Sequence, residues 1–423
     1  MVVEKIDKNN LHKPQILSSN ISSSNWDGGI QSDITFGELQ KIQKTIMVEE
    51  QPSLKTHVSS SDFTPYNYLT HIESSIPNDL ISPKNYSRIC NLASIFNNNI
   101  TSFFGFETRL NKMDGCVDYL LAISSKKGER EALLDLLKRQ QLPTRFLQKP
   151  EWGQIQSFVE DWSNEGSILN KNVLGIWLEF DTAYSSSESL IPGLFVQIKP
   201  ISKEKSKDPM NYSWITEQLF PALTGKRLDC KNEEMINKSI KQLPNSSFLL
   251  FVAAMISRES SIIRTTIKMN SNQIIPYLES LGWKDENNGL DSLLEQVSKH
   301  STRIILHMDI GKEINPKIGI ECSFSPDLYH FEKRWDGFFD YLIKEGACLP
   351  EKKEQLISFM RVDQEDNTNK FSLDSYLPAV KFNDNNFSGT IVKYLSHIKI
   401  QYKPNGSIFA KAYPGVRLFG KTN

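Results

Sequence analysis

The sequence lacks several features that would place it in a common class of protein. No run of apolar residues approaches the 18 or more that a membrane-spanning helix requires, so we expect no membrane span. Net charge is almost absent as well, because 49 Lys and Arg balance 50 Asp and Glu. A balanced chain lacks the basic excess of nucleic-acid-binding proteins, so we expect no nucleic-acid partner.

Cysteine is scarce and shows no pairing pattern. The chain has 5 cysteines. They lie far apart without a CxxC pair, which predicts free thiols in a reducing, cytoplasmic environment. The first residues, MVVEKIDKNNLHKPQ, contain no apolar core of a secretory signal.

The sequence also lacks the short motifs of the commonest enzymes. DDxxD, HExxH, GxGxxG, GxSxG and a phosphate-binding P-loop are all absent. Their absence argues against helical isoprenyl synthases, zinc hydrolases, nucleotide-binding folds and α/β-hydrolases. We therefore expect no organic cofactor, and the site has to be sought in the pattern of the strands.

Two regions differ in composition. Residues 1–61 are rich in Ser, Asn and Gln, and we interpret them as a largely flexible arm with one short helix at 36–46. Residues 62–423 alternate helical and strand-like stretches and are expected to form a single domain. Polar insertions such as residues 203–211 and 363–371 are expected to be surface loops.

The alternation repeats five times. Each time, an amphipathic helical stretch precedes two strand-like runs that are joined by a polar turn. The paired runs are SFFGFETRL with CVDYLLAIS, NVLGIWLEF with GLFVQIK, SFLLFVAAMIS with SIIRTTIKM, TRIILHMDI with KIGIECSF, and SHIKIQY with SIFAKAY. This order predicts an α+β protein with ten antiparallel strands closed into a barrel and helices outside. An open α+β sheet or two split domains is the alternative.

Side chains alternate across a strand, so each run divides into two faces. One face is apolar and suits the packing of helices. The other face is mixed, and either lines a barrel lumen or meets solvent on an open sheet. Aromatic residues on the mixed face favour the lumen, because large apolar rings are not expected on a sheet face that is exposed to water. These aromatic residues are Trp177, Phe195, Phe409 and Tyr413.

The mixed face carries many charges. Its cations come from several different strands: Arg109, Lys199, Arg264, Lys268, Lys317, Lys399 and Lys411. Cations that converge in a partly desolvated cavity need a strong anion, for which a diphosphate is suited. Aromatic faces stabilise a carbocation, and carboxylates orient or deprotonate a nucleophile. The carboxylates of this face are Glu107, Glu179, Asp309 and Glu321.

The fivefold helix–strand–strand–helix order resembles the ABBA-type (PT-barrel) aromatic and peptide prenyltransferases over roughly residues 80 to 418. Three short runs look similar to the alternate Lys, Arg and Tyr positions of that family: Lys411-Ala412-Tyr413, Arg264 to Lys268, and Lys199 in FVQIK. Departures are Met269-Asn270, where the family continues with Tyr, and an unusually acidic lumen around Asp309 and Glu321.

The resemblance implies a transferase of natural product biosynthesis that moves an allylic group from its diphosphate to an aromatic small molecule or a peptide. It implies diphosphate binding by Arg109, Lys199, Arg264, Lys268, Lys399 and Lys411, and a cation screen of Tyr413 and Trp177. A lumen glutamate, Glu107 or Glu179, would hold the acceptor. Asp309 and Glu321 could bind Mg²⁺, or form ion pairs with lysines.

Two other functions stay open at this point. The barrel could bind an anionic or peptide ligand without catalysis. It could also catalyse a carboxylate-based cyclase or lyase reaction on a peptide in the same cavity.

Overall fold

A computed structural model of the chain describes residues 65–96, 100–126, 128–139, 141–182, 191–256, 262–285, 289–325, 332–360, 379–384 and 387–422. The arm expected over residues 1–61, its helix at 36–46 and the insertion at 363–371 lie outside these ranges. Among the described helices, none has the length and apolar character needed to cross a bilayer. The five cysteines are free thiols, as predicted.

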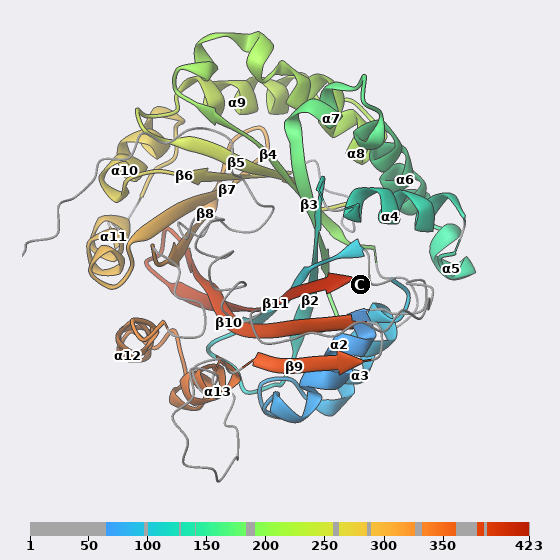
Figure 1. Ribbon diagram of the computed structural model, residues 1–423. Coiled ribbons are helices and arrows are strands. Elements are labelled where there is room, and N and C mark those ends of the chain that lie inside the picture. Colours follow the sequence, from blue (N-terminus) through green and yellow to red (C-terminus); the bar gives the residue numbers. More distant parts are fainter. Residues whose placement is uncertain are drawn as a thin grey trace, which may run out of the picture.

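Eleven strands form one antiparallel sheet in the order β11-β1-β2-β3-β4-β5-β6-β7-β8-β10-β9. Because β11 pairs with both β1 and β10, ten of the strands close into a barrel, and β9 is attached outside to β10 (Figure 1). The predicted barrel is therefore confirmed. The strands are β1 Phe103–Arg109, β2 Val117–Ser124, β3 Val173–Phe180, β4 Gly193–Ser202, β5 Phe248–Ala254, β6 Ile263–Lys268, β7 Arg303–Ile310, β8 Ile314–Ser323, β9 Ala379–Asp384, β10 Phe387–Tyr402 and β11 Ile408–Thr422.

Helices surround the barrel and connect one hairpin to the next (Figure 1). The α-helices are α2 Pro65–Ile72, α3 Pro83–Ala93, α4 Glu129–Lys138, α5 Thr144–Leu147, α6 Pro150–Ser163, α7 Ile168–Asn172, α8 Phe220–Thr224, α9 Cys230–Lys241, α10 Ser271–Ser280, α11 Gly289–His300, α12 Trp335–Lys344 and α13 Pro350–Met360. Short 3₁₀ turns are η1 Glu73–Ser75, η3 Lys205–Lys207 and η4 Pro209–Asn211, and η5 Ile215–Leu219 is a π-helical turn. The insertion at 203–211 thus contains two of these turns instead of a plain loop.

Local sequence explains where individual helices begin. The Ser82 side chain accepts the backbone N–H of Asn85, and Pro83 occupies the first helical position of α3, as the sequence predicts. The stretch SWITEQLFPAL is not one continuous α-helix, because η5 precedes α8. Pro221 has no N–H to donate to the preceding turn, which favours the wider hydrogen-bond spacing there.

The core lies between the barrel and its helices. On β10, Ile398, Ile400 and Tyr402 are at most 1% exposed and belong to the main hydrophobic cluster. The alternate residues of the same strand, His397 and Lys399, point into the lumen and line a cavity there. The division of the strands into an apolar outer face and a mixed inner face is therefore correct.

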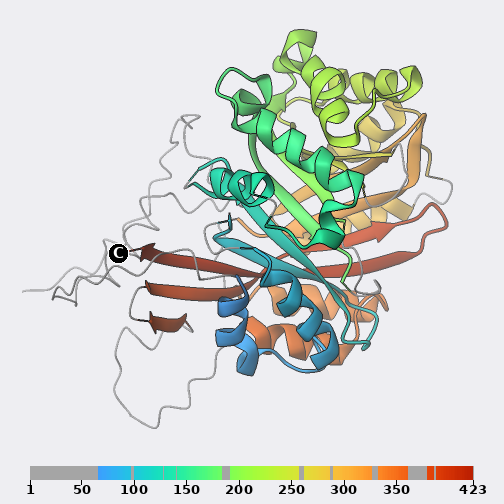
Figure 2. The ribbon, with the colours of Figure 1, turned by 90° about the vertical axis from the view of Figure 1, so that its right-hand side faces the viewer.

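The last hairpin is longer than the sequence pattern indicates. Its strands were expected at 396–402 and 407–413, but the ladder continues until Phe387 faces Thr422, and β9 extends it further. A register shift between Leu395 and His397 breaks the two-residue alternation on which the expectation depended. Figure 2 shows that the extended hairpin projects beyond the barrel on one side.

Candidate functional site

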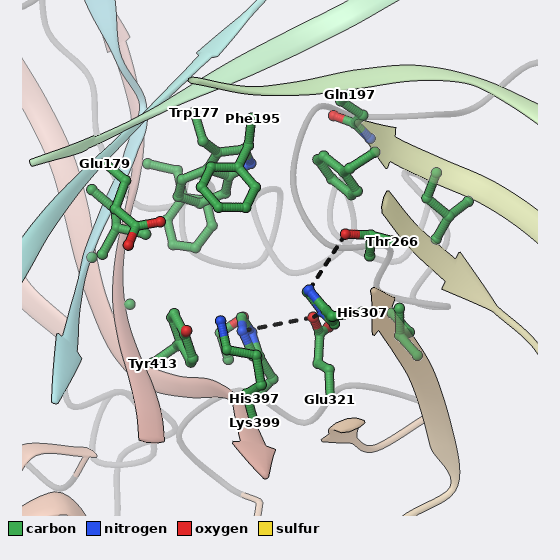
Figure 3. A pocket seen from close by; sticks show the side chains of 18 of the residues that line it. Trp177, Glu179, Phe195, Gln197, Thr266, His307, Glu321, His397, Lys399 and Tyr413 are labelled. Carbon is green, nitrogen blue, oxygen red and sulfur yellow. Dashed lines mark hydrogen bonds and ion pairs between the residues drawn. The ribbon is translucent and has the colours of Figure 1, made fainter. Parts of the chain in front are cut away.

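The lumen contains a cavity whose empty volume, including the part open to solvent, is about 980 Å³. Figure 3 shows two unlike sides of this cavity. Trp177, Glu179 and Phe195 lie on one side. His307, Lys399 and Tyr413 lie on the other. The cavity is thus able to hold an apolar group and a charged group at the same time.

Aromatic rings form the first side. Trp177 and Phe195 are register partners on β3 and β4, so their side chains leave the same face of the sheet next to each other. Phe103 on β1 meets the Trp177 ring edge-on, with 5.0 Å between ring centroids. These rings offer apolar surface and electron-rich faces, which suit a hydrocarbon chain or a carbocation.

Glu179 is the carboxylate of this aromatic side. It lines the cavity and makes no hydrogen bond or ion pair with any residue that the structure describes. Burial, and then the negative charge of Glu107, raise the pKa of Glu179 above its ordinary value. A carboxylate with a raised pKa and no partner is able to receive a proton or an N–H hydrogen bond from a ligand.

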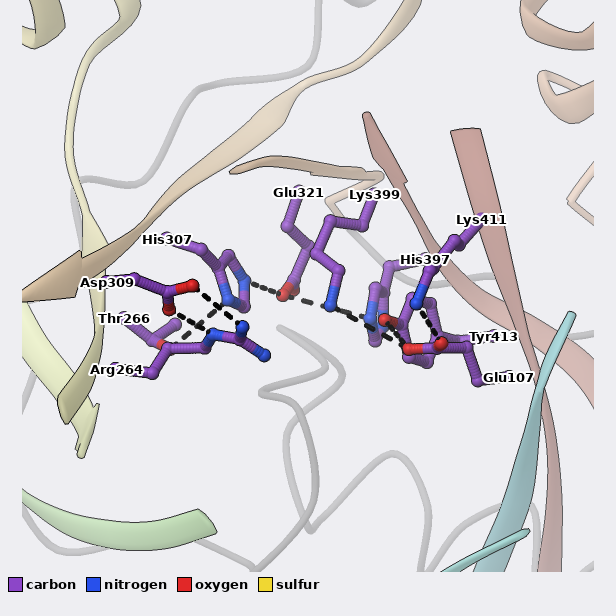
Figure 4. A network of polar contacts seen from close by, with 10 residues as sticks. All are labelled: Glu107, Arg264, Thr266, His307, Asp309, Glu321, His397, Lys399, Lys411 and Tyr413. Carbon is purple, nitrogen blue, oxygen red and sulfur yellow. Dashed lines mark hydrogen bonds and ion pairs between the residues drawn. The ribbon is translucent and has the colours of Figure 1, made fainter. Parts of the chain in front are cut away.

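Glu107, by contrast, is fully engaged (Figure 4). Its two carboxylate oxygens accept hydrogen bonds from the Lys411 ammonium and the Tyr413 hydroxyl. Burial raises the pKa of Glu107, but Lys411 and Lys399 lower it more and hold it at about 2. Burial and the negative charge of Glu107 also raise the pKa of Tyr413. Of the two glutamates that the sequence offered for the acceptor, only Glu179 has free oxygens facing the cavity.

Lys399 on β10 is a buried cation of the lumen. It is 6% exposed, and its Nζ lies 4.9 Å from the centroid of the Tyr413 ring. The nearest carboxylate oxygen, Glu107 Oε2, is 3.9 Å away and already accepts the Tyr413 hydroxyl. Burial lowers the pKa of Lys399 to about 8. A ligand anion would supply the acceptors that this ammonium lacks.

Two histidines share Glu321 (Figure 4). His307 Nε2 lies 2.8 Å from Glu321 Oε2, and His397 Nε2 lies 3.8 Å from the same oxygen. Burial raises the pKa of Glu321, but the two imidazoles lower it to about 2, so the carboxylate is ionised and only accepts. His307 therefore donates from Nε2, and its Nδ1 accepts from the Thr266 hydroxyl at 3.4 Å.

The buried His397 is expected to make the folded chain less stable in mild acid. Burial lowers the pKa of His397 to about 4, whereas an unfolded histidine titrates near 6.5. Between these pH values the imidazole is protonated in the unfolded chain but not in the folded one. The free energy of unfolding therefore falls as the pH drops from 6.5 to 4, by roughly 3 kcal/mol for this residue. Urea unfolding at pH 7 and pH 4.5 should show this loss, and His397→Asn should reduce it. An equal loss in the variant would contradict the assignment.

The carboxylates predicted to bind Mg²⁺ are occupied by protein groups. Both oxygens of Asp309 accept from Arg264, at 2.7 Å from Nε and 3.0 Å from Nη2. Burial raises the pKa of Asp309, but this bidentate pair lowers it overall. Across the described ranges, no three His, Cys, Asp or Glu side chains are grouped to hold a metal ion. Asp309 is thus engaged by Arg264, and Glu321 by His307.

The structure brings most of the predicted residues to the lumen, with three exceptions. One is Phe409, which is 38% exposed and does not line the cavity. Lys268 lines the cavity together with Trp177, Glu179, Lys399 and Tyr413. Lys411 and Arg264 lie just behind it in their ion pairs. Lys199 is exposed, next to a register shift in β4, and Arg109 lies 4.0 Å from Asp114 near the β1–β2 turn. Neither of these two lines the cavity.

One cation of the cavity, Arg303, was not predicted from the sequence. Arg303 is 6% exposed, lines the cavity and donates from Nε to Ser323 Oγ at 2.8 Å. Its alternation with His307 and Asp309 along β7 was available as a signal, because residues two and four apart on a strand share a face. The expected strand, TRIILHMDI, included Arg303, but of that run only His307 and Asp309 were assigned to the mixed face.

Comparison with known proteins gives matches among solved structures only. No family model matches the sequence, and no curated protein matches it. Among solved structures, the chain is similar to the apo form of the prenyltransferase PriB, with 8% identity, a TM-score of 0.45, and coverage of 82% of this chain and 94% of that one. The ternary complex of PriB with L-tryptophan and dimethylallyl thiolodiphosphate gives 9% identity, a TM-score of 0.39, and coverage of 84% and 94%. The barrel assignment rests on the strand order of this chain itself.

Proposed function

We propose that the barrel transfers an allylic group from its diphosphate to an aromatic acceptor, either a small molecule or an aromatic side chain of a peptide. The observation that carries this proposal is the division of one cavity in the lumen into an aromatic side and a charged side. Aromatic rings and an unpaired carboxyl, Glu179, face a side that holds the buried ammonium of Lys399.

The charged side would bind the donor's diphosphate. Lys268, Arg303 and Lys399 line the cavity from three different strands, and buried cations bind phosphate oxygens strongly. When the allylic C–O bond breaks, its electron pair leaves with the diphosphate. The cations stabilise that developing charge where little water competes.

The aromatic side would hold the allylic group and the acceptor. Trp177 and Phe195 on this side, and Tyr413 across the cavity, present ring faces that stabilise the allylic cation and keep water from it. The acceptor ring supplies the electron pair of the new C–C bond, and its proton is then lost. Glu179 accepts the acceptor's N–H or O–H hydrogen bond and takes up the proton.

Donor binding gives the first test. Dimethylallyl or geranyl diphosphate is expected to raise the melting temperature, because a ligand that binds only the folded state stabilises it. Lys399→Met should abolish this shift, since it removes the buried ammonium that meets the diphosphate. Lys312→Gln, an exposed lysine in the β7–β8 turn, is the control and should keep the shift.

An assay of product formation distinguishes an enzyme that transfers the allylic group from a barrel that only binds its ligand. Dimethylallyl diphosphate with a panel of indole and phenol acceptors should release inorganic diphosphate and give prenylated product. A shift in melting temperature without product would favour a barrel that only binds its ligand, and no shift would refute the proposal. The assay with and without EDTA tests the predicted use of Mg²⁺, for which the side chains at 309 and 321 provide no site of their own.

A further inference from the structure

A hydroxyl, an imidazole and a carboxylate follow one another in the wall of the cavity. Thr266 on β6 and His307 on β7 are register partners, so their side chains lie next to each other on the inner face. Glu321 on β8 pairs with Ile305, two residues before His307, and its side chain therefore shares that face. Figure 3 shows the three side chains together in the cavity. Prenyl transfer as proposed above gives none of them a role in the reaction.

Hydrogen bonds connect the three groups in a fixed direction. Because Glu321 is ionised and only accepts, His307 carries its proton on Nε2, which donates to Glu321 at 2.8 Å. The lone pair of Nδ1 then faces the Thr266 hydroxyl, which donates to it at 3.4 Å. This hydrogen bond is long, as catalytic hydrogen bonds often are before a substrate binds. Burial lowers the pKa of His307 below its ordinary value, so the imidazole is neutral at pH 7 and able to take up the hydroxyl proton.

The order of these groups is that of a nucleophile, a general base and a carboxylate that orients the base. The hydroxyl of Thr266 reaches the base because its side chain faces the lumen. Thr265, the preceding residue, faces away from the lumen. It is fully buried, does not line the cavity, and its hydroxyl has no hydrogen-bond partner among the described residues. Strand alternation thus places one of two adjacent threonines against the imidazole.

An ammonium lies close to the imidazole. Gly319 lies between His307 and Lys399, since a Cβ on this glycine would be 3.0 Å from His307 Cβ and 3.6 Å from Lys399 Cδ. Lys399 is 6% exposed and lines the cavity. A buried ammonium stabilises negative charge that develops on a substrate oxygen. On the other side of the cavity, the rings of Trp177 and Phe195 offer apolar surface to a hydrocarbon group.

We infer that the cavity also hydrolyses a carboxylic ester that carries an apolar group, with Thr266 as the nucleophile and His307 as the general base. Thr266 Oγ1 attacks the carbonyl carbon, and its proton passes to His307 Nδ1. An electron pair of the carbonyl bond moves onto the carbonyl oxygen, whose negative charge Lys399 stabilises. The C–O bond to the alcohol then breaks, and the alcohol leaves with the proton from Nδ1. The acyl group remains on Thr266 Oγ1.

Water completes the cycle. It attacks the acyl carbon while His307 Nδ1 takes up one of its protons, and the bond from the acyl carbon to Thr266 Oγ1 breaks. The carboxylic acid is released, and the proton returns from Nδ1 to the threonine oxygen. Glu321 is a positioning residue that keeps Nδ1 directed at the hydroxyl. None of these steps uses an allylic diphosphate, so the activity is independent of prenyl transfer.

Covalent labelling of the full chain tests the nucleophile. An alkyl fluorophosphonate is expected to react with Thr266: the Oγ1–P bond forms, fluoride leaves, and the hydroxyl proton passes through His307 to solvent. Mass spectrometry of the intact chain and of its peptides locates the adduct. Thr266→Val should give no adduct, whereas Thr265→Val, the same change one residue earlier, should be labelled as the wild type is. No adduct in the wild type, or one that persists in Thr266→Val, would overturn the inference.

Hydrolysis of p-nitrophenyl butyrate measures the reaction itself. Its kcat/KM should fall by about 10²-fold or more in Thr266→Val and in His307→Gln, because each removes a group that takes part in proton transfer. Thr265→Val should hydrolyse the ester as the wild type does. Thr266→Ser keeps a hydroxyl in place and should retain both the activity and the adduct. If the valine variant is poorly folded, an inactive Thr266→Ser or a fully active His307→Gln rules the nucleophile out.

The role of Glu321 requires a readout of the imidazole that it orients. Burial lowers the pKa of His307, Glu321 raises it, and Lys399 and Arg264 lower it further. Glu321→Gln should therefore move the acid limb of the pH–rate profile to lower pH, besides reducing kcat/KM for the ester. An acid limb that stays in place would show that Glu321 does not act through His307. Failure of prenyl transfer in the assays above would leave these results unchanged.

Discussion

Glu179→Gln is expected to lower the rate of prenyl transfer to an indole or phenol acceptor by about 10²–10⁴-fold, the usual contribution of a positioned general base. The side-chain amide still accepts the acceptor's hydrogen bond through its oxygen, but it cannot take up a proton at neutral pH. The loss should therefore appear in kcat, with KM for the acceptor little changed. Steady-state kinetics with dimethylallyl diphosphate measures both.

Two controls make this result specific to the cavity. Glu165→Gln makes the same chemical change on an exposed side chain after α6 and should have no effect. Binding of dimethylallyl thiolodiphosphate by Glu179→Gln should equal that of the wild type, since Glu179 lies on the side away from the diphosphate. A variant that retains most of its kcat would show that another group accepts the proton.

Much of this architecture could be predicted from the sequence, because the barrel depends on strong local patterns. The alternation of Ile398 and Ile400 with His397 and Lys399 follows directly from strand geometry, and the structure keeps those faces. Closure was an inference from unpaired edges, and the β11–β1 pairing confirms it. The pattern failed where a register shift interrupts it, near Ser396 on β10 and between Gln197 and Ile201 on β4.

Pairing between side chains could not be predicted in the same way. Glu107 and Glu179 have the same chemistry and both lie on inner faces, so the sequence did not distinguish them. The difference comes from β11, which is about 300 residues further along the chain than β1 and brings Lys411 and Tyr413 to Glu107. Glu179 has no such neighbour. The pairing of Asp309 with Arg264 on the neighbouring strand likewise could not be predicted from the sequence.

Glu107→Gln is expected to reduce the free energy of unfolding by about 3–5 kcal/mol, the cost of removing one partner from a buried ion pair. Glu107 is 4% exposed and is the counter-ion of Lys411 and the nearest carboxylate to Lys399. Its removal leaves two ammonium groups facing each other in the lumen without their anion. Urea unfolding at pH 7 measures the change.

The direction in which stability changes with pH also tests the ion pair of Glu107 with Lys411. The pKa of Glu107 is lowered in the folded chain to about 2, below the ordinary glutamate value of 4.5, so its contribution to stability is present above pH 4.5 and is lost as the pH falls toward 2. Glu107→Gln should not show this part of the acid loss.

A double variant separates a structural ion pair from a catalytic glutamate. Glu107→Gln combined with Lys411→Gln removes both charges, so it should recover part of the stability that the single variant loses. Glu179→Gln should cost no stability, because it relieves the repulsion between Glu179 and Glu107 that raises the pKa of Glu179. Equal destabilisation by Glu107→Gln and Glu179→Gln would mean that the two carboxylates share the ion-pair network, and the division between a structural and a reacting glutamate would then be wrong.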